Sequence, residues 1–215
     1  GAGCLPACGE GKFCEGGVCY PELISRKKGT KIEAFIGIGA AIAGYGQVQL
    51  EGNSFFGNDT TALIAHSNKE VTLTSNVIER NGVRPYGSTK GEFAVPAVKV
   101  SGITKKLDVD GNMLLDNIRT AVELDQETSP ASKVAFRAYR NHVGGNGRFL
   151  TQAIHQGDGF RLLTKQDKGQ VELEVEENFL TLNRRSGFSS KGFVTGEIVG
   201  NLFDDHPLRA LVIHD

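Results

Sequence analysis

The sequence predicts an all-β fold in which the chain winds into a solenoid of stacked parallel strands. Three observations predict it: a segment pattern that recurs six times, alternating apolar residues ahead of an asparagine in each copy, and a second asparagine five residues later. Alternation with a period of two is typical of a strand with one buried face. Recurrence at uneven intervals is typical of a repeat protein whose units differ in loop length.

The six copies are aligned on their first asparagine. They are VQLEGNSFFGN, VTLTSNVIERN, LDVDGNMLLDN, FRAYRNHVGGN, LEVEENFLTLN and GEIVGNLFDDH. The first asparagines are Asn53, Asn76, Asn112, Asn141, Asn178 and Asn201, and the second ones are Asn58, Asn81, Asn117, Asn146 and Asn183. Seventeen of the eighteen residues at positions −5, −3 and +2 are apolar, and the other is glycine. These positions are therefore expected to face the core.

The two asparagines of each copy are interpreted as two corners that bracket a short strand. Stacked strands lie about 4.8 Å apart, so an inward asparagine can hydrogen-bond to its equivalents in the coils above and below. Such a ladder satisfies amides whose burial would otherwise be costly. Asparagine also tolerates the left-handed backbone that a sharp corner needs, so we expect the asparagines to adopt it. In the sixth copy His206 occupies the second slot and is expected to be a turn residue, not a ligand.

The competing architecture is the leucine-rich repeat, which has the same spacing at positions −5, −3, 0 and +2. That repeat also needs leucine at −8, where no copy has it, and an apolar residue at +5, where this chain keeps asparagine. The copies lie 23, 36, 29, 37 and 23 residues apart, which is irregular for that repeat. The sequence therefore favours a right-handed parallel β-helix of about six to seven coils.

The N-terminal segment carries every cysteine of the chain, namely Cys4, Cys8, Cys14 and Cys19. An even set of cysteines in a short segment rich in glycine is typical of disulfides, which staple segments too small to bury a core. Zinc is the alternative, although paired C-x2-C knuckles are absent. The predicted domains are a Cys-rich disulfide knot over residues 1–22, a linker or cap over 23–30, and the β-helix over 31–215.

Disulfides form in oxidising compartments, so we expect a secreted, periplasmic or cell-surface protein. The AGC at residues 2–4 also resembles the end of a bacterial lipoprotein signal, which would make Cys4 the lipid-bearing residue. A net charge of −1 argues against capture by nucleic acid or an anionic membrane. No apolar run approaches the roughly 18 residues of a transmembrane helix.

From about residue 31 to 215 the chain resembles the parallel β-helix repeat proteins of the pectate-lyase-like superfold, through its GN-x-F-x-x-N steps. The resemblance implies a fold but no single function, because the superfold hosts polysaccharide lyases, glycoside hydrolases, epimerases, esterases, phage tailspikes and non-catalytic surface proteins. The catalytic signatures expected of its glycoside hydrolases or pectin esterases are absent. Zincin, nucleotide-binding and nucleophile-elbow motifs are absent too. Catalysis is left open, with a polysaccharide lyase or glycoside hydrolase as the expected type.

Ligands of such a solenoid are expected at the outward positions −4 and −2 of stacked strands. Three consecutive copies place Asp108 and Asp110, Arg137 and Tyr139, and Glu174 and Glu176 there. Paired carboxylates suit inverting glycoside hydrolysis or a hard cation such as calcium, the one cofactor that the sequence suggests. The arginine fits a uronate carboxylate, and the tyrosine ring can stack on a sugar. The alternative is a structural ladder of opposite charges across neighbouring strands.

Other charged residues follow the second corner. Arg119, Arg148 and Arg185 form a column that is expected on the surface. In the insertion over residues 148–160, His155 and Asp158 could form an acid–base or metal pair, although a loop histidine is more often simply solvated.

The leading functional hypothesis is an exported β-helix protein that engages a polysaccharide along its outward face. The alternative is a non-catalytic structural or adhesive surface scaffold. The C-terminal RALVIHD stops on a strand pattern with no evident cap, which suggests self-association or a larger assembly.

Overall fold

The computed structural model describes residues 12–15, 18–21, 39–44, 46–58, 60–66, 68–82, 96–127, 133–147, 157–164 and 170–214. The chain divides into two compact units, Gly1–Phe35 and Ile36–Asp215. In the first unit, β1 (Lys12–Glu15) and β2 (Val18–Pro21) form an antiparallel hairpin whose register sets Cys14 opposite Cys19. The predicted disulfides, including those of Cys4 and Cys8, and the linker over 23–30 fall on residues or side chains outside the described part.

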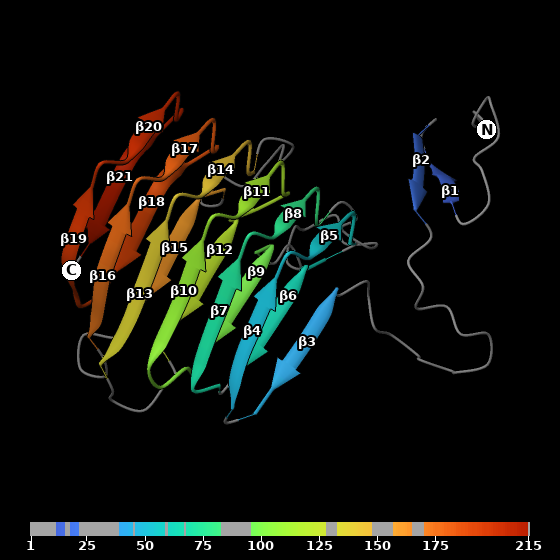
Figure 1. Cartoon of the computed structure of the whole chain (residues 1–215). Coiled ribbons are helices and arrows are strands. Elements are labelled where there is room, and N and C mark those ends of the chain that lie inside the picture. The colour runs from blue at the N-terminus through green and yellow to red at the C-terminus, as the bar shows by residue number, and fades with distance from the viewer. Residues whose placement is uncertain are drawn as a thin grey trace. The chain divides into compact units, whose positions relative to one another are not determined.

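The second unit is all-β and contains three parallel sheets whose strands stack in register (Figure 1). The first sheet contains β4 (Gln47–Glu51), β7 (Glu70–Thr74), β10 (Lys106–Asp110), β13 (Val134–Tyr139), β16 (Val171–Glu176) and β19 (Val194–Val199). The second sheet contains β5 (Ser54–Phe56), β8 (Val77–Glu79), β11 (Met113–Leu115), β14 (His142–Gly144), β17 (Phe179–Thr181) and β20 (Leu202–Asp204). The third sheet contains β3 (Ala40–Ala43), β6 (Leu63–His66), β9 (Val98–Ser101), β12 (Val122–Asp125), β15 (Phe160–Leu163), β18 (Ser186–Lys191) and β21 (Arg209–His214).

After β3 the chain visits the first, second and third sheets in turn, six times over, and each round is one coil. In Figure 1 the colour passes coil by coil from blue at β3 to red at β21. This arrangement is consistent with the predicted parallel β-helix. The described residues contain no helix, whereas a leucine-rich repeat would place a helix or a 3₁₀ turn in each unit.

The core fills the inside of the coils. In the third coil Leu107, Val109 and Leu114 occupy positions −5, −3 and +2 and are fully buried, as the alternation predicts. The third sheet adds Val122 and Leu124, which the asparagine-based alignment did not identify. Burial of each such aliphatic side chain stabilises the fold by about 1.5–3 kcal/mol.

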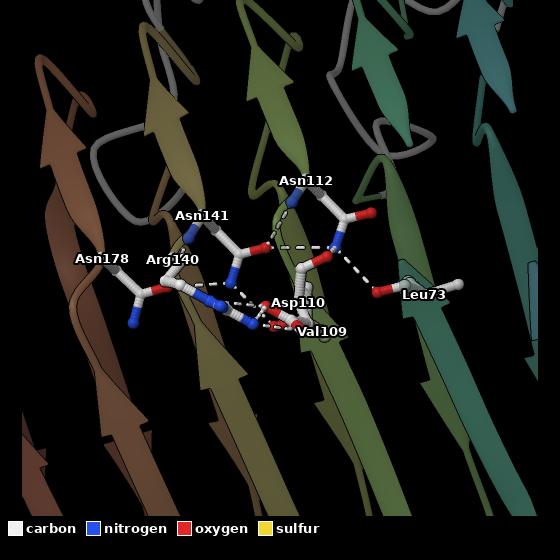
Figure 2. A network of polar contacts seen from close by, with 7 residues as sticks. All are labelled: Leu73, Val109, Asp110, Asn112, Arg140, Asn141 and Asn178. Carbon is white, nitrogen blue, oxygen red and sulfur yellow. Dashed lines mark hydrogen bonds and ion pairs between the residues drawn. The ribbon is translucent and has the colours of Figure 1, made fainter. Parts of the chain in front are cut away.

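The first asparagine of each copy forms the predicted ladder, which is confirmed. Asn112 donates its backbone N–H and its Nδ2 to Oδ1 of Asn141, at 2.9 and 3.1 Å. The same Nδ2 donates to the carbonyl of Leu73 in the preceding coil at 2.8 Å (Figure 2). Each amide therefore links three consecutive coils.

The second asparagines form a parallel ladder from Asn58 to Asn183. Its last slot is filled by His206, whose Nδ1 lies 3.3 Å from the Asn183 carbonyl oxygen and whose Nε2 lies 3.1 Å from that of Leu180. His206 is thus a corner residue, as expected. In the other coils the Nδ2 of the second asparagine donates to the carbonyl at the same position of the preceding coil, for example from Asn183 to Val143. Leu180 supplies the equivalent carbonyl for His206.

The left-handed backbone conformation was assigned to the wrong residue. It is adopted by the residue ahead of each ladder asparagine, with φ of 54° at Ser75, 50° at Arg140 and 51° at Leu182. In five other corners the residue at this position is a glycine, for example Gly111. The ladder uses both the backbone N–H and the side chain of the asparagine. Since both must point along the stack, the sharp turn is made one residue earlier.

Candidate functional site

The outer surface of β10, β13 and β16 brings together the six residues proposed from the sequence. The register sets Asp108 beside Arg137 and Glu174 in one column, and Asp110 beside Tyr139 and Glu176 in the next. We call this surface the charged face. All six alternate with the buried core residues of their strands and lie on the outer side of the sheet.

The centre of the charged face is Glu174, which is contacted from β13 by two side chains. Arg137 approaches with its Nε 3.0 Å from Oε2 and its Nη2 3.3 Å from Oε1. The hydroxyl of Tyr139 donates to Oε2 of the same carboxylate. Burial, followed by the hydrogen bond to Glu174, raises the pKa of Tyr139 to about 12. Tyr139 therefore stays a hydrogen-bond donor at neutral pH.

The two aspartates of the charged face pair with cations that were not among the candidate residues predicted from the sequence. Arg140 donates twice from its Nη2 to Asp110, at 2.9 and 2.8 Å (Figure 2), and Lys106 pairs with Asp108 at 2.5 Å. Arg140 occupies the left-handed corner position, and this backbone conformation was expected of the neighbouring asparagine. Arg137 pairs with Glu174 instead of bridging the column to Asp108.

A second group of charges lies on the outer side of the third sheet, and we call it the buried charge network. The register places Glu123 of β12 between Lys99 of β9 and Arg161 of β15. The carboxylate lies 3.6 Å from Lys99 and 3.5 Å from Arg161, and its side chain is only 9% exposed. Burial raises the pKa of Glu123, although both cations oppose that rise.

The structure also describes three charged residues that follow the second corner, and it corrects one expectation about them. Asp158 is fully buried and pairs with Arg185 at 3.2 Å. Burial raises the pKa of Asp158, opposed most by Arg185. Burial lowers the pKa of Arg119 to about 10, so neither Arg119 nor Arg185 is the simple surface charge that was expected. Arg148 and His155 lie outside the described residues.

Sequence reasoning missed this network because the insertions before the third sheet differ in length, which hides the alignment of Lys99, Glu123 and Arg161.

A carboxyl with a raised pKa holds its proton at a higher pH than a free one, which is a property of acid catalysts. Buried structural ion pairs show the same property.

Among the described residues no group of three or more His, Cys, Asp or Glu side chains is placed to hold a metal ion, and calcium stays a prediction. No helix in the described part of the chain is long and apolar enough to cross a membrane.

Comparison with known proteins found no match to this chain among family models, curated proteins or solved structures. The interpretation of the chain therefore depends on its stacked strands, its ladders and its charged surfaces.

Proposed function

We propose that this chain is an exported, right-handed parallel β-helix protein that engages a polysaccharide along the charged face. The hand follows from the strong preference of parallel strand connections for right-handed crossovers. The charged face offers a rigid surface on which chemically distinct side chains recur at each coil, about 4.8 Å apart. That repeat is close to the length of one sugar residue in an extended glycan.

The observation that carries the proposal is the convergence of Arg137 and Tyr139 on Glu174. Their geometry already suits a carboxylate, and the Arg137 side chain is 41% exposed. The carboxylate of an acidic sugar can take the place of Glu174, with the guanidinium as a two-pronged donor and the phenol as a third. An acidic polysaccharide is therefore the favoured class, and whether it is cleaved is a separate question.

The test is a glycan array with acidic and neutral polysaccharides, followed by an Arg137→Ala/Glu174→Ala double variant. The matched control is Lys133→Ala/Glu172→Ala, because Lys133 and Glu172 form a 3.1 Å pair near the starts of β13 and β16. We expect the first double variant to lose binding to the acidic glycan and the control to keep it. Binding that survives the first variant rejects the site.

The second candidate function is a structural or adhesive scaffold. It is favoured by the cations that already hold Asp108, Asp110 and Glu174, since paired charges are an ordinary way to cover a solvated sheet. An absence of binding to every glycan on the array supports the scaffold. A solution mass of a multiple of the chain supports a role in a larger assembly.

A further inference from the structure

A lysine on the outer side of the third sheet lies between two carboxylates of the next coil. Lys99 belongs to β9, and Glu123 and Asp125 both belong to β12, which pairs with β9 in parallel. The Nζ of Lys99 lies 3.6 Å from Oε1 of Glu123 and 3.5 Å from Oδ2 of Asp125. We call these three residues the Lys–Glu–Asp group. The group joins two consecutive coils at one point.

Each carboxylate of the group directs one oxygen at Lys99 and has its other oxygen held by a different donor. The backbone N–H of Glu127 donates to Oδ1 of Asp125 at 3.1 Å. The Nη1 of Arg161 lies 3.5 Å from Oε2 of Glu123. Both carboxylates are thereby fixed with an oxygen toward the same amine. The Cγ of Asp125 is therefore held next to the Nζ of Lys99, which is the arrangement that favours reaction between bound groups.

The Lys–Glu–Asp group is largely withdrawn from water. The side chain of Glu123 is 9% exposed, that of Asp125 20% and that of Lys99 34%. In water, condensation of an ammonium with a carboxylate is opposed because two hydrated charges are lost. Here burial has already removed much of that hydration, so replacing two partly buried charges with one neutral amide is favourable. Glu123 would keep Arg161 as its counter-ion.

Glu123 has the properties of a proton carrier between the other two residues. Burial raises its pKa, and the charge of Asp125 acts in the same direction, although Arg161 and Lys99 oppose the rise. Its carboxylate therefore takes up a proton more readily than an exposed one. A lysine attacks only as the neutral amine, so the proton of Lys99 must first leave, and Oε1 of Glu123 lies beside it.

We propose that Lys99 and Asp125 condense into an amide bond that links β9 to β12, and that Glu123 carries the protons. One proton passes from the Lys99 ammonium through Glu123 to Oδ2 of Asp125. The neutral Nζ then attacks Cγ, and the N–H of Glu127 stabilises the negative charge that develops on Oδ1. A second proton passes from Nζ through Glu123 to Oδ2. The Cγ–Oδ2 bond breaks, water leaves, and the Cγ–Nζ bond remains, with no change of oxidation state.

The amide bond would fasten two coils of the solenoid covalently. It closes the chain between residues 99 and 125 and so restricts the unfolded chain, which raises stability in the way that a disulfide does. The Lys–Glu–Asp group lies on the third sheet. The proposal is therefore independent of glycan binding at the charged face.

A second lysine provides a matched control. Lys106 pairs with Asp108 at 2.5 Å, and their side chains are 34% and 18% exposed, close to the values for Lys99 and Asp125. Among the ion pairs of the described residues, Lys106 contacts this one carboxylate. A second carboxylate that carries its proton is missing from that pair, so we expect no amide there.

The test is mass spectrometry of the full chain after reduction and denaturation. We expect wild type to be lighter than its sequence by one water molecule. Because trypsin does not cleave after an acylated lysine, its digest should contain the peptides 91–105 and 120–133 joined together. Lys99→Arg and Asp125→Ala should have the full sequence mass and melt at a lower temperature than wild type. The control Lys106→Arg should keep the loss of water.

Glu123→Gln keeps the size of the side chain but cannot accept a proton from Lys99. It should be recovered without the cross-link, because a proton transfer that contributes about a hundredfold to the rate is lost. Circular dichroism of each variant verifies that it is folded, so the mass reports on the chemistry. Wild type that keeps its full sequence mass after prolonged incubation overturns the proposal. A loss of water that persists in Lys99→Arg also overturns it, and a cross-link in Glu123→Gln equal to that of wild type overturns the role of Glu123.

Discussion

Asn112 and Asn141, 29 residues apart, share a single oxygen: both the backbone N–H and the Nδ2 of Asn112 donate to Oδ1 of Asn141. The oxygen uses both of its lone pairs, and the nitrogen of each amide also reaches a carbonyl one coil back. A buried polar corner is therefore compatible with an apolar core, because every coil supplies the partner of the next. The loss of unfolding free energy on replacing an asparagine should therefore be larger inside the stack than in the first coil.

The ladder predicts that Asn141→Ala lowers the free energy of unfolding by about 3 kcal/mol. The change leaves the backbone N–H of Asn112 without its acceptor, removes one of the bonds of its Nδ2, and takes a donor from the carbonyl of Val109, and each such loss costs about 1–3 kcal/mol. Asn53→Ala, at an exposed position of the first coil, should cost less than about 1 kcal/mol. Urea denaturation followed by circular dichroism measures both. Equal losses would contradict the ladder.

Leu182 holds a corner conformation that suits glycine, with φ of 51°. Leu182→Gly should raise the free energy of unfolding by about 1 kcal/mol, because a left-handed conformation costs about 1–2 kcal/mol for a residue with a Cβ. Thr181→Gly, one residue earlier in β17, should lower stability, since a strand interior gains nothing from glycine. Thermal unfolding of the two variants gives the comparison. A loss in Leu182→Gly would show that the side chain contributes more than the strain.

Asp158 makes stability depend on pH. Its pKa is raised above the ordinary 3.8, so the folded chain takes up this proton before the unfolded chain does as pH falls. Its contribution is therefore fully present below the unfolded pKa and is lost as pH rises through the folded pKa. Compared with Asp158→Asn, wild type should be relatively more stable at pH about 4 than at pH about 7. A stability difference that stays constant over this range would contradict the raised pKa.

His206 ends the second ladder with an imidazole. His206→Asn would supply the oxygen that accepts from the preceding asparagine in the other coils, and should stabilise the chain by about 1 kcal/mol. Hydrogen exchange at the last coil measures the change locally. Faster exchange in the variant would show that the ring packing with Phe203, at a centroid distance of 6.2 Å, matters more.

The sequence predicted most of the solenoid because the ladder requires one residue type at one position in every coil. Alternating core residues and paired asparagines placed the first and second sheets, their register and both corners. The third sheet was not aligned, because insertions of variable length precede it. The left-handed residues were missed since Ser75, Arg140 and Leu182 show no preference for that conformation, whereas glycine marks the same position in other coils.

The charged surfaces were predicted less well for a related reason. Alternation identified which side chains point outward, so Arg137, Tyr139 and Glu174 were placed on one face. It does not specify which charges pair, and Arg140 reaches Asp110 from a corner. The raised pKa values of Glu123 and Asp158 arise from burial, which depends on the folded surroundings of the third sheet and has no local sequence signature.

The most direct test of the whole account is a solution NMR measurement of contacts between the side-chain amides of Asn112, Asn141 and Asn178. The stacked coils predict close contacts across 29 and 37 residues, together with slow exchange of the Asn112 and Asn141 backbone amides. Side-chain amides without cross-coil contacts, and backbone amides that exchange as fast as those of an unfolded chain, would contradict it.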